Sequence, residues 1–578
     1  MAAIISGNFR SLNAAAFVDE VKGDRSNIYI GLGKSSPWGG TTTANTSDTN
    51  APAPTDTLDA INEARQQMIG MKLVTDQDIS HVIPRYDWVA GAEFVAWDST
   101  DPAIFDKAFY CLTSDFKVYK CIVAPISGGV SDVPTHVDAN ITATSDGYHW
   151  KYMYTILASD SEKFLTNSYL PVKTLTEETK AQVAATITAN ATTFTIDNEN
   201  PRIMVGQTIT AIANGATEPS ITADTVVTAV SGKTITASAS IPALADGNIV
   251  TFGDFLITDP KFSQQQSQAA SRELTSAQGI HRLKLINGGS GYDNTGAATS
   301  LTITGDGSGL VTTGTINSNY ISGGSFVSDI IITGDNATNQ ADNVGADFSV
   351  AQATITSTTS GASGAEYIPI ISPRGRPGFN TSHANGGHGC DPVFELGGFY
   401  VGINVQISGT VDSEIANTQD FRQISLLRNP LISGVIPVDP PTAINTLKYI
   451  EYVTGYDDKA LQLAQLVQQN DYVLENTSSG FKGYIVNIDI ATDKRRIYYF
   501  QNDLTGYVTA TSADMVVKTG GQVQDDYALA AGNLSADPIK PAPENFNAGS
   551  GEMLFLENRD PIQRSTSQIE DVKLIIEF

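Results

Sequence analysis

Cysteine is scarce in this chain, which has only Cys111, Cys121 and Cys390 in 578 residues. Three cysteines cannot form the disulfide framework typical of small secreted domains. Cys111 and Cys121 could pair, but we expect buried free thiols in a reducing cytosol. Long apolar runs are also missing, since no stretch approaches the ~18 residues of a membrane span. Residues 1–17 lack the basic start of a signal peptide. The sequence therefore predicts a protein made and folded in a cytoplasm.

Basic residues are few, with 35 Lys and Arg against 62 Asp and Glu and a net charge of −27. Residues 285–373 contain no Lys or Arg at all. Such a surface repels phosphate backbones and anionic lipids, so neither nucleic acid nor a membrane is an expected partner. The charge is sufficient to keep a large protein soluble.

Catalytic signatures are absent as well. The sequence has no GxSxG, HExxH or Walker motif, and no GxGxxG between a strand and a helix. The 62 acids make some close carboxylate pair inevitable, so their number does not indicate a glycosidase. His149, beside Trp150, is better interpreted as a packed strand residue than as a base. We expect no enzyme activity and no cofactor.

The best metal candidate is the segment HANGGHGC, which holds His383, His388 and Cys390. These side chains are good zinc ligands, but a structural zinc usually needs a fourth, and only Asp391 is nearby. A glycine-rich loop on a packed surface explains the segment equally well. We therefore predict no metal site, with these three residues as the candidates if there is one.

A second acidic segment contains Asp335, Asp342 and Asp347. It has neither the EF-hand pattern nor a tandem GGxGxD repeat. Asp and Asn are also common in exposed turns, which is the interpretation that we favour over a calcium loop.

The chain is too long for one core and changes composition along its length. Residues 27–33 and the alternating segments 117–126 and 148–157 are predicted strands. A helix is predicted over about 57–71, after the good N-cap residues Thr55 and Asp56, with Leu58, Ile61, Arg65 and Met68 on its buried face.

Three further segments have the appearance of separate modules. Residues 181–258 are rich in Thr, Ala, Ile and Val, with four short strands and a hairpin turn at Ser231-Gly232. Residues 259–389 form a second, glycine-rich β-module, in which near-repeats of TGD and GGS are too few for a solenoid. Residues 433–548 contain a predicted helix near 459–469 and a small β-barrel. A strand with one apolar face ends the chain at 571–578.

Five phrases containing Trp or Pro are spread along the chain, at residues 33–38 (GKSSPW), 82–88 (VIPRYDW), 145–156, 421–431 (FRQISLLRNPL) and 550–562. Together and in this order they resemble the baseplate wedge protein made from gene eight of the T-even, contractile-tailed phages. The resemblance implies a structural subunit of the tail baseplate, assembled in the bacterial host cytoplasm. It also implies a homodimer bound to other wedge proteins, whose contacts rearrange when the tail contracts.

Within these phrases, large and charged side chains are predicted to anchor either the core or an interface, and the sequence does not separate the two. Pro84 forces an extended backbone before it, and Phe421, Ile424 and Leu426 are expected to pack inward. The predicted anchors are Trp38, Arg85, Asp87, Trp88, Arg422, Arg428, Glu557, Asn558 and Arg559.

The expected fold is mainly β with some α (α+β), a β-sandwich core interrupted by two or three small inserted β-modules. The core would comprise residues 1–180, 390–432 and 549–578. The alternative function is a receptor-binding or polysaccharide-depolymerising tail protein, supported by the Thr- and Gly-rich middle. Fibre-type tail proteins are typically trimers, so stoichiometry separates the two.

Overall fold

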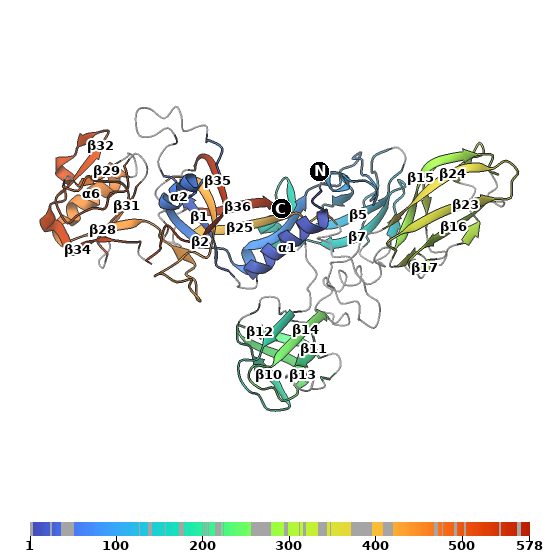
Figure 1. Cartoon of the computed structure of the whole chain (residues 1–578), viewed down its shortest axis with the longest axis horizontal. Helices are drawn as coiled ribbons and strands as arrows, with labels where there is room; N and C mark the ends of the chain where they lie inside the picture. Colours follow the sequence, from blue (N-terminus) through green and yellow to red (C-terminus); the bar gives the residue numbers. More distant parts are fainter. Residues whose placement is uncertain are drawn as a thin grey trace. The chain divides into compact units, whose positions relative to one another are not determined.

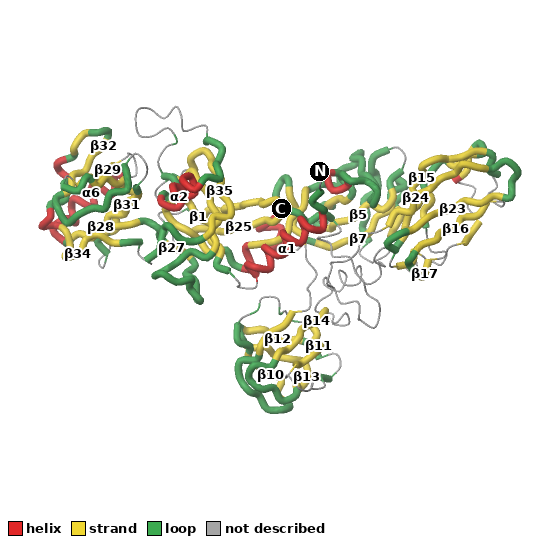
Figure 2. The backbone as a smooth tube through the Cα atoms, viewed as in Figure 1, coloured by secondary structure: helices red, strands yellow, loops and turns green. Residues whose placement is uncertain are grey.

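The computed structural model is mainly β, as expected, and Figure 2 shows few helices among many strands. The described helices are α1 (Gly7–Lys22), α2 (Leu58–Gln66), α3 (Ala158–Phe164) and α6 (Asp457–Val467). The structure describes residues 4–22, 26–35, 38, 51–125, 128–136, 141–156, 158–172, 179–198, 200, 203, 205, 207–213, 221–222, 225–255, 279–293, 299–310, 313–315, 320–332, 344–346, 348–371, 396–408, 415, 420–467, 472–476, 478–490, 494–501, 505–542, 545–562, 564 and 568–578. None of the helices in these ranges is both long and apolar enough to cross a membrane.

The residue contacts divide the chain into two units. Unit 1 comprises Met1–Asp19, Ser80–Gly402 and Ile575–Phe578, and unit 2 comprises Glu20–Ile79 and Ile403–Leu574. Each unit is therefore built from segments that are far apart in the sequence.

Unit 2 contains a five-stranded sheet built from both ends of the chain. Its strands in order are β27 (Ala443–Ile444), β2 (Met68–Leu73), β1 (Ile28–Gly33), β26 (Phe421–Arg428) and β35 (Glu552–Ile562). The central strand β1 is buried along its whole length, and each large apolar side chain there contributes about 1.5–3 kcal/mol. Phe421, Ile424 and Leu426 of β26 are buried, as predicted.

The helix predicted over 57–71 is wrong in its second half. Helix α2 ends at Gln66, and strand β2 follows at once. Thr57 is the N-cap and accepts a hydrogen bond from Ala60 N, while Leu58 is 71% exposed rather than buried. A strand forms here in place of a longer helix because Gly70 is a poor helix former and pairs with Leu32 of β1.

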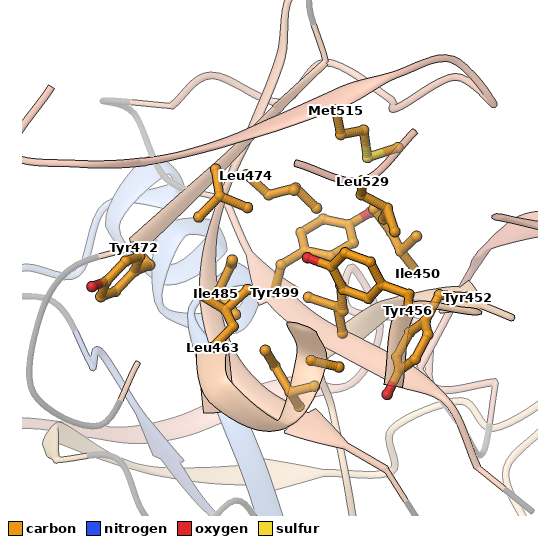
Figure 3. Packing of buried hydrophobic residues seen from close by; sticks show 14 of the residues in the cluster. Ile450, Tyr452, Tyr456, Leu463, Tyr472, Leu474, Ile485, Tyr499, Met515 and Leu529 are labelled. Atoms are coloured by element: carbon orange, nitrogen blue, oxygen red, sulfur yellow. The ribbon is translucent and has the colours of Figure 1, made fainter. Parts of the chain in front are cut away.

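The C-terminal part of unit 2 also holds a seven-stranded sheet with α6 packed against it. Its order is β33 (Gln522–Val523), β32 (Met515–Thr519), β29 (Tyr472–Asn476), β30 (Phe481–Asp489), β31 (Arg496–Phe500), β28 (Lys448–Tyr452) and β34 (Leu534–Lys540). In the described residues the strand order runs from β33 to β34, and the small β-barrel expected here stays a prediction. Figure 3 shows Leu463 of α6 in one apolar cluster with Leu474 and Tyr499 of the sheet.

In unit 1, a four-stranded sheet carries five fully buried aromatic side chains, Tyr110, Tyr119, Trp150, Tyr152 and Tyr154. Its order is β4 (Tyr110–Leu112), β5 (Lys117–Val123), β7 (His149–Thr155) and β6 (Ile141–Ala143). Cys111 and Cys121 are buried free thiols, as expected, and burial raises the pKa of both. Strand β3 (Ile79–Pro84) pairs with β8 (Tyr169–Val172) in the same unit.

Unit 1 also contains two small β-modules. In the first, two three-stranded sheets share one apolar cluster, and their strands are β9 (Thr179–Gln182), β10 (Ala191–Thr195), β11 (Gln207–Ala213), β12 (Val227–Ser231), β13 (Thr234–Ile241) and β14 (Ile249–Phe255). Ser231 pairs with Thr234, so the hairpin turn is Gly232-Lys233, one residue later than predicted.

The second module packs the sheet of β15, β24 and β21 against that of β16, β18 and β23, and Figure 1 labels its longer strands. Its strands are β15 (Ile280–Ser290), β16 (Thr299–Gly305), β17 (Ser308–Leu310), β18 (Thr313–Thr315), β19 (Ile321–Ser322), β20 (Ser325–Phe326), β21 (Ile330–Ile331), β22 (Val344–Ala346), β23 (Ala351–Ser357) and β24 (Ser363–Ile371).

Helix α1 was not predicted, although Ala14, Val18 and Val21 are buried at helical spacing. In unit 1, Arg10 of α1 holds the last residues of the chain. Arg10 pairs with Glu577, and the Nε of Arg10 donates a hydrogen bond to Phe578 O at 2.5 Å. The remaining strands are β25 (Tyr400–Ser408) and β36 (Ile569–Glu577).

Candidate interaction surface

Six of the nine predicted anchors gather at one side of the five-stranded sheet in unit 2. They are Trp38, Arg422, Arg428, Glu557, Asn558 and Arg559. The antiparallel pairing of β26 with β35 brings them together, because Gln423 lies opposite Asn558 and Arg428 opposite Glu552. Two phrases more than a hundred residues apart therefore lie on neighbouring strands, and we call this strand pair with its six anchors the anchor surface.

Arg422 and Trp38 tie the GKSSPW phrase to the sheet. The guanidinium Nη1 of Arg422 donates to Ser35 O at 2.7 Å, and Arg422 is only 4% exposed. The indole Nε1 of Trp38 donates to Arg559 O at 3.0 Å, and the Lys34 ammonium lies 4.9 Å from the centre of the Trp38 ring. Strands β26 and β35 thus both contact the GKSSPW phrase.

On β35 the polar side chains make cross-strand and same-strand contacts. Gln423 Nε2 donates to Asn558 Oδ1 at 2.9 Å, and Asn558 Nδ2 donates to Pro52 O at 2.9 Å. Arg559 pairs with Glu557 at 2.7 Å, with each side chain about one third exposed. These two charged groups keep part of their surface free for another molecule.

Arg428 lies near the other end of the same strand pair. Its Nε is 2.7 Å from Glu20 Oε1, and its Nη1 is 3.4 Å from Glu552 Oε2. Its side chain is 37% exposed, so it resembles Arg559 rather than the buried Arg422. Each of the six anchors has a partner within the chain, and a role at an interface stays a prediction.

The other three anchors, Arg85, Asp87 and Trp88, lie in unit 1. Arg85 pairs with Asp87 at 2.8 Å, and its Nη1 donates to Thr166 O at 2.8 Å. Trp88 is only partly buried against the aromatic cluster around Trp150, which is itself fully buried. The predicted large buried anchor at 88 is thus a half-buried one.

These anchors make hydrogen bonds and ion pairs, together with the Lys34–Trp38 contact. Within the described ranges, no group of three or more His, Cys, Asp and Glu is placed to hold a metal ion. The zinc candidates His383, His388 and Cys390, and the calcium candidates Asp335, Asp342 and Asp347, lie outside the described residues. Burial lowers the pKa of His149, which favours its neutral form.

Sequence reasoning missed a polar joint that attaches the second β-module within unit 1, here called the module joint. Arg282 pairs with Asp329 and donates from Nη2 to Trp97 O at 2.7 Å, while Lys284 pairs with Asp98 at 2.6 Å. Arg282 and Lys284 are alternate residues of β15, just before the long segment without Lys or Arg. The position of these two cations just before that segment is the sequence feature that could have indicated the module joint.

Exposed apolar side chains on a short loop of unit 2 were also missed. Val435, Ile436 and Val438 are 61%, 50% and 102% exposed. The signal in the sequence was the run GVIPV, which combines aliphatic side chains with the turn former Gly434.

Comparison with known families gives one match. Residues 3–127 match the family described as bacteriophage T4, Gp8, a segment that includes the phrases at 33–38 and 82–88. No match is found among curated proteins. The resemblance predicted from the phrases is therefore confirmed in this segment, and the match supports a structural protein of the tail baseplate of a T4-like phage.

Proposed function

We propose that the chain is a wedge subunit that acts in baseplate assembly and in the rearrangement during contraction of the tail. One observation extends this proposal beyond the matched residues 3–127. Strand β1, inside the match, pairs with β26, which in turn pairs with β35. Because β26 and β35 carry the phrases at 421–431 and 550–562, the wedge-like segment has its partners in the regions where the resemblance continues.

The proposed core is a β-sandwich made of residues 1–180, 390–432 and 549–578, with modules inserted at 181–258, 259–389 and 433–548. An insertion is tolerated when its two ends lie close together. Three strand pairs support this: Thr179 lies opposite Phe252, Ile280 opposite Ile371, and Tyr449 opposite Lys540. In the described residues, strands near the two ends of each proposed module thus lie side by side.

We further propose a homodimer that contacts other wedge proteins and is assembled in the host cytoplasm. An exposed apolar stripe on and just before α1 supports self-association, because Ile5, Phe9 and Leu12 are 70%, 56% and 36% exposed. Their spacing places them on one face of a helix. The homodimer and the contraction role are also implied by the family resemblance.

Light scattering coupled to size exclusion tests the stoichiometry. We expect twice the 61.3 kDa of one chain, and Phe9→Ser with Leu12→Ser should return the mass to that of a monomer. Val230→Ser, at a residue 36% exposed in the first β-module, is the control and should leave the mass unchanged. A trimer would instead favour the receptor-binding alternative.

Membership of the baseplate is tested in the phage that encodes this chain. Mass spectrometry of purified, DNA-free tails should detect the chain together with the other baseplate proteins. Its absence from tails that contain a complete baseplate would contradict the proposed function.

A further inference from the structure

The loop at residues 433–439 of unit 2 presents aliphatic side chains to solvent. Val435, Ile436 and Val438 are 61%, 50% and 102% exposed, and they stand within four residues of one another. Isolated exposed apolar residues are ordinary on protein surfaces, whereas a group of neighbouring exposed apolar side chains is a candidate interaction site. We call these three side chains the apolar tip.

The backbone that carries the apolar tip is fixed by a tight turn. Ile432 N donates to Val435 O at 2.9 Å, and Val435 N donates back to Ile432 O at 3.1 Å. Ser433 and Gly434 between them have φ of 52° and 81°. Two positive φ values in a two-residue loop are those of a type I′ turn, in which few conformations remain available.

Hydrogen bonds anchor the loop on both sides of the apolar tip. Asn27 Nδ2 donates to Pro437 O at 2.8 Å, and Tyr29 Oη donates to Pro441 O at 2.9 Å. Ser433 N donates to Asn545 O at 3.1 Å. The side chains of Val and Ile are β-branched and have few rotamers. Ordering this loop on binding therefore costs little entropy, which is the main cost that preorganisation removes.

We propose that the apolar tip inserts into an apolar pocket with a basic rim on another baseplate protein. This rests on the proposed function of the chain in the baseplate. The pocket of the partner is expected to have a basic rim because Asp439 is exposed beside the tip. Asp439 is the only charged residue in 429–447, so the complementary charge on the partner is positive. A second copy that met the tip with its own tip would bring Asp439 against Asp439, so the homodimer proposed above uses the apolar stripe at α1 and not this loop.

A complementation assay tests the tip. A phage lacking the gene for this chain is supplied with the wild type, with Ile436→Asn and Val438→Asn together, or with the control Val350→Asn, which alters a residue 69% exposed in the second β-module. We expect incorporation of the double variant into baseplates to fall at least tenfold and the control to match the wild type. Thermal unfolding of the purified double variant should be unchanged, because the altered side chains are exposed.

Photo-crosslinking identifies the occupant. Benzoylphenylalanine is placed at position 438, or at position 350 as the control, and purified baseplates are irradiated and analysed by mass spectrometry. A crosslink from 438 to an apolar segment flanked by Lys or Arg in a different baseplate protein supports the proposal. A crosslink only to a second copy, no crosslink, or normal incorporation of the double variant would overturn it. Absence of the wild-type chain from baseplates would instead overturn the proposed function.

Discussion

The module joint of unit 1 and the anchor surface of unit 2 both use arginine to connect distant segments, but in different settings. At the joint, Arg282 is 6% exposed and pairs with Asp329 as well as with a backbone carbonyl. On the anchor surface, the buried Arg422 donates to a carbonyl, with Asp420 only at 4.0 Å, and the closer ion pairs of Arg428 and Arg559 are partly exposed. Buried charge is expensive to leave unpaired, whereas exposed pairs contribute little. We therefore expect the joint to be the more sensitive of the two to substitution.

The largest effect is expected for Arg282→Met. The change leaves the Asp329 carboxylate and the Trp97 carbonyl without this partner, at a cost of about 3 kcal/mol. Hydrogen–deuterium exchange of the amides of β15 measures the loss of local stability. Lys284→Met, at a side chain 36% exposed, is the control and should lose less. Equal losses would show that burial does not decide the strength of the joint.

Arg422→Met should have a smaller effect, about 2 kcal/mol, since it removes the hydrogen bond that this buried guanidinium donates to the partly buried carbonyl of Ser35. Amide exchange along β26 and β35 reports it. A loss greater than that of Arg282→Met would reverse the comparison between the two regions.

Asp98→Asn tests the joint through pH. Desolvation raises the pKa of Asp98, but hydrogen bonds from Lys284 and Thr100 outweigh it and hold the pKa below its usual 3.8. A carboxylate whose pKa is lowered by folding stabilises the folded state at pH values above its pKa in the unfolded chain. This stabilisation is lost as the pH falls through the pKa of the folded state. The variant should be less stable than the wild type by about 1 kcal/mol at neutral pH. The difference should shrink below about pH 4, and a constant difference in urea unfolding would contradict this.

The smallest effect is expected for Arg428→Gln, at most about 1 kcal/mol, because the side chain is 37% exposed. High salt should remove most of the difference from the wild type, since it screens exposed pairs. Urea unfolding at low and high salt measures this. A large loss of stability that does not depend on salt would show that Arg428 contributes as the buried Arg422 does.

Local pattern predicted much of the secondary structure. The strand at 27–33, the alternating segments that became β5 and β7, and the helix near 459–469 all appear close to their predicted places. The failure at 68–71 has a tertiary cause, because pairing with β1 overrides the helical spacing of apolar residues. Helix α1 was missed because its other face carries Phe9 and Leu12, so its polarity pattern is weak.

The contacts of the candidate site could not be predicted from local pattern. The sequence identified Arg422 and Trp38 as anchors, but their partners are backbone carbonyls of Ser35 and Arg559. Nothing in the side chains of those partners indicates such a contact. The pairing of Arg282 with Asp329 likewise depends on how β15 and the segment before β21 meet in space.

The pairing of β1 with β26 has a consequence for how the protein folds. Tyr29 lies opposite Leu427, so the ribosome must add almost four hundred residues before the central strand of the sheet meets this partner. At ordinary rates of synthesis this takes roughly 20 to 80 s. The two β-modules of unit 1 close through strand pairs within themselves and need not wait. The edge of β1 that pairs with β26 therefore lacks this partner during most of synthesis, although β2 pairs with the other edge early, and a chaperone that binds the apolar β1 segment would raise the yield of folded protein.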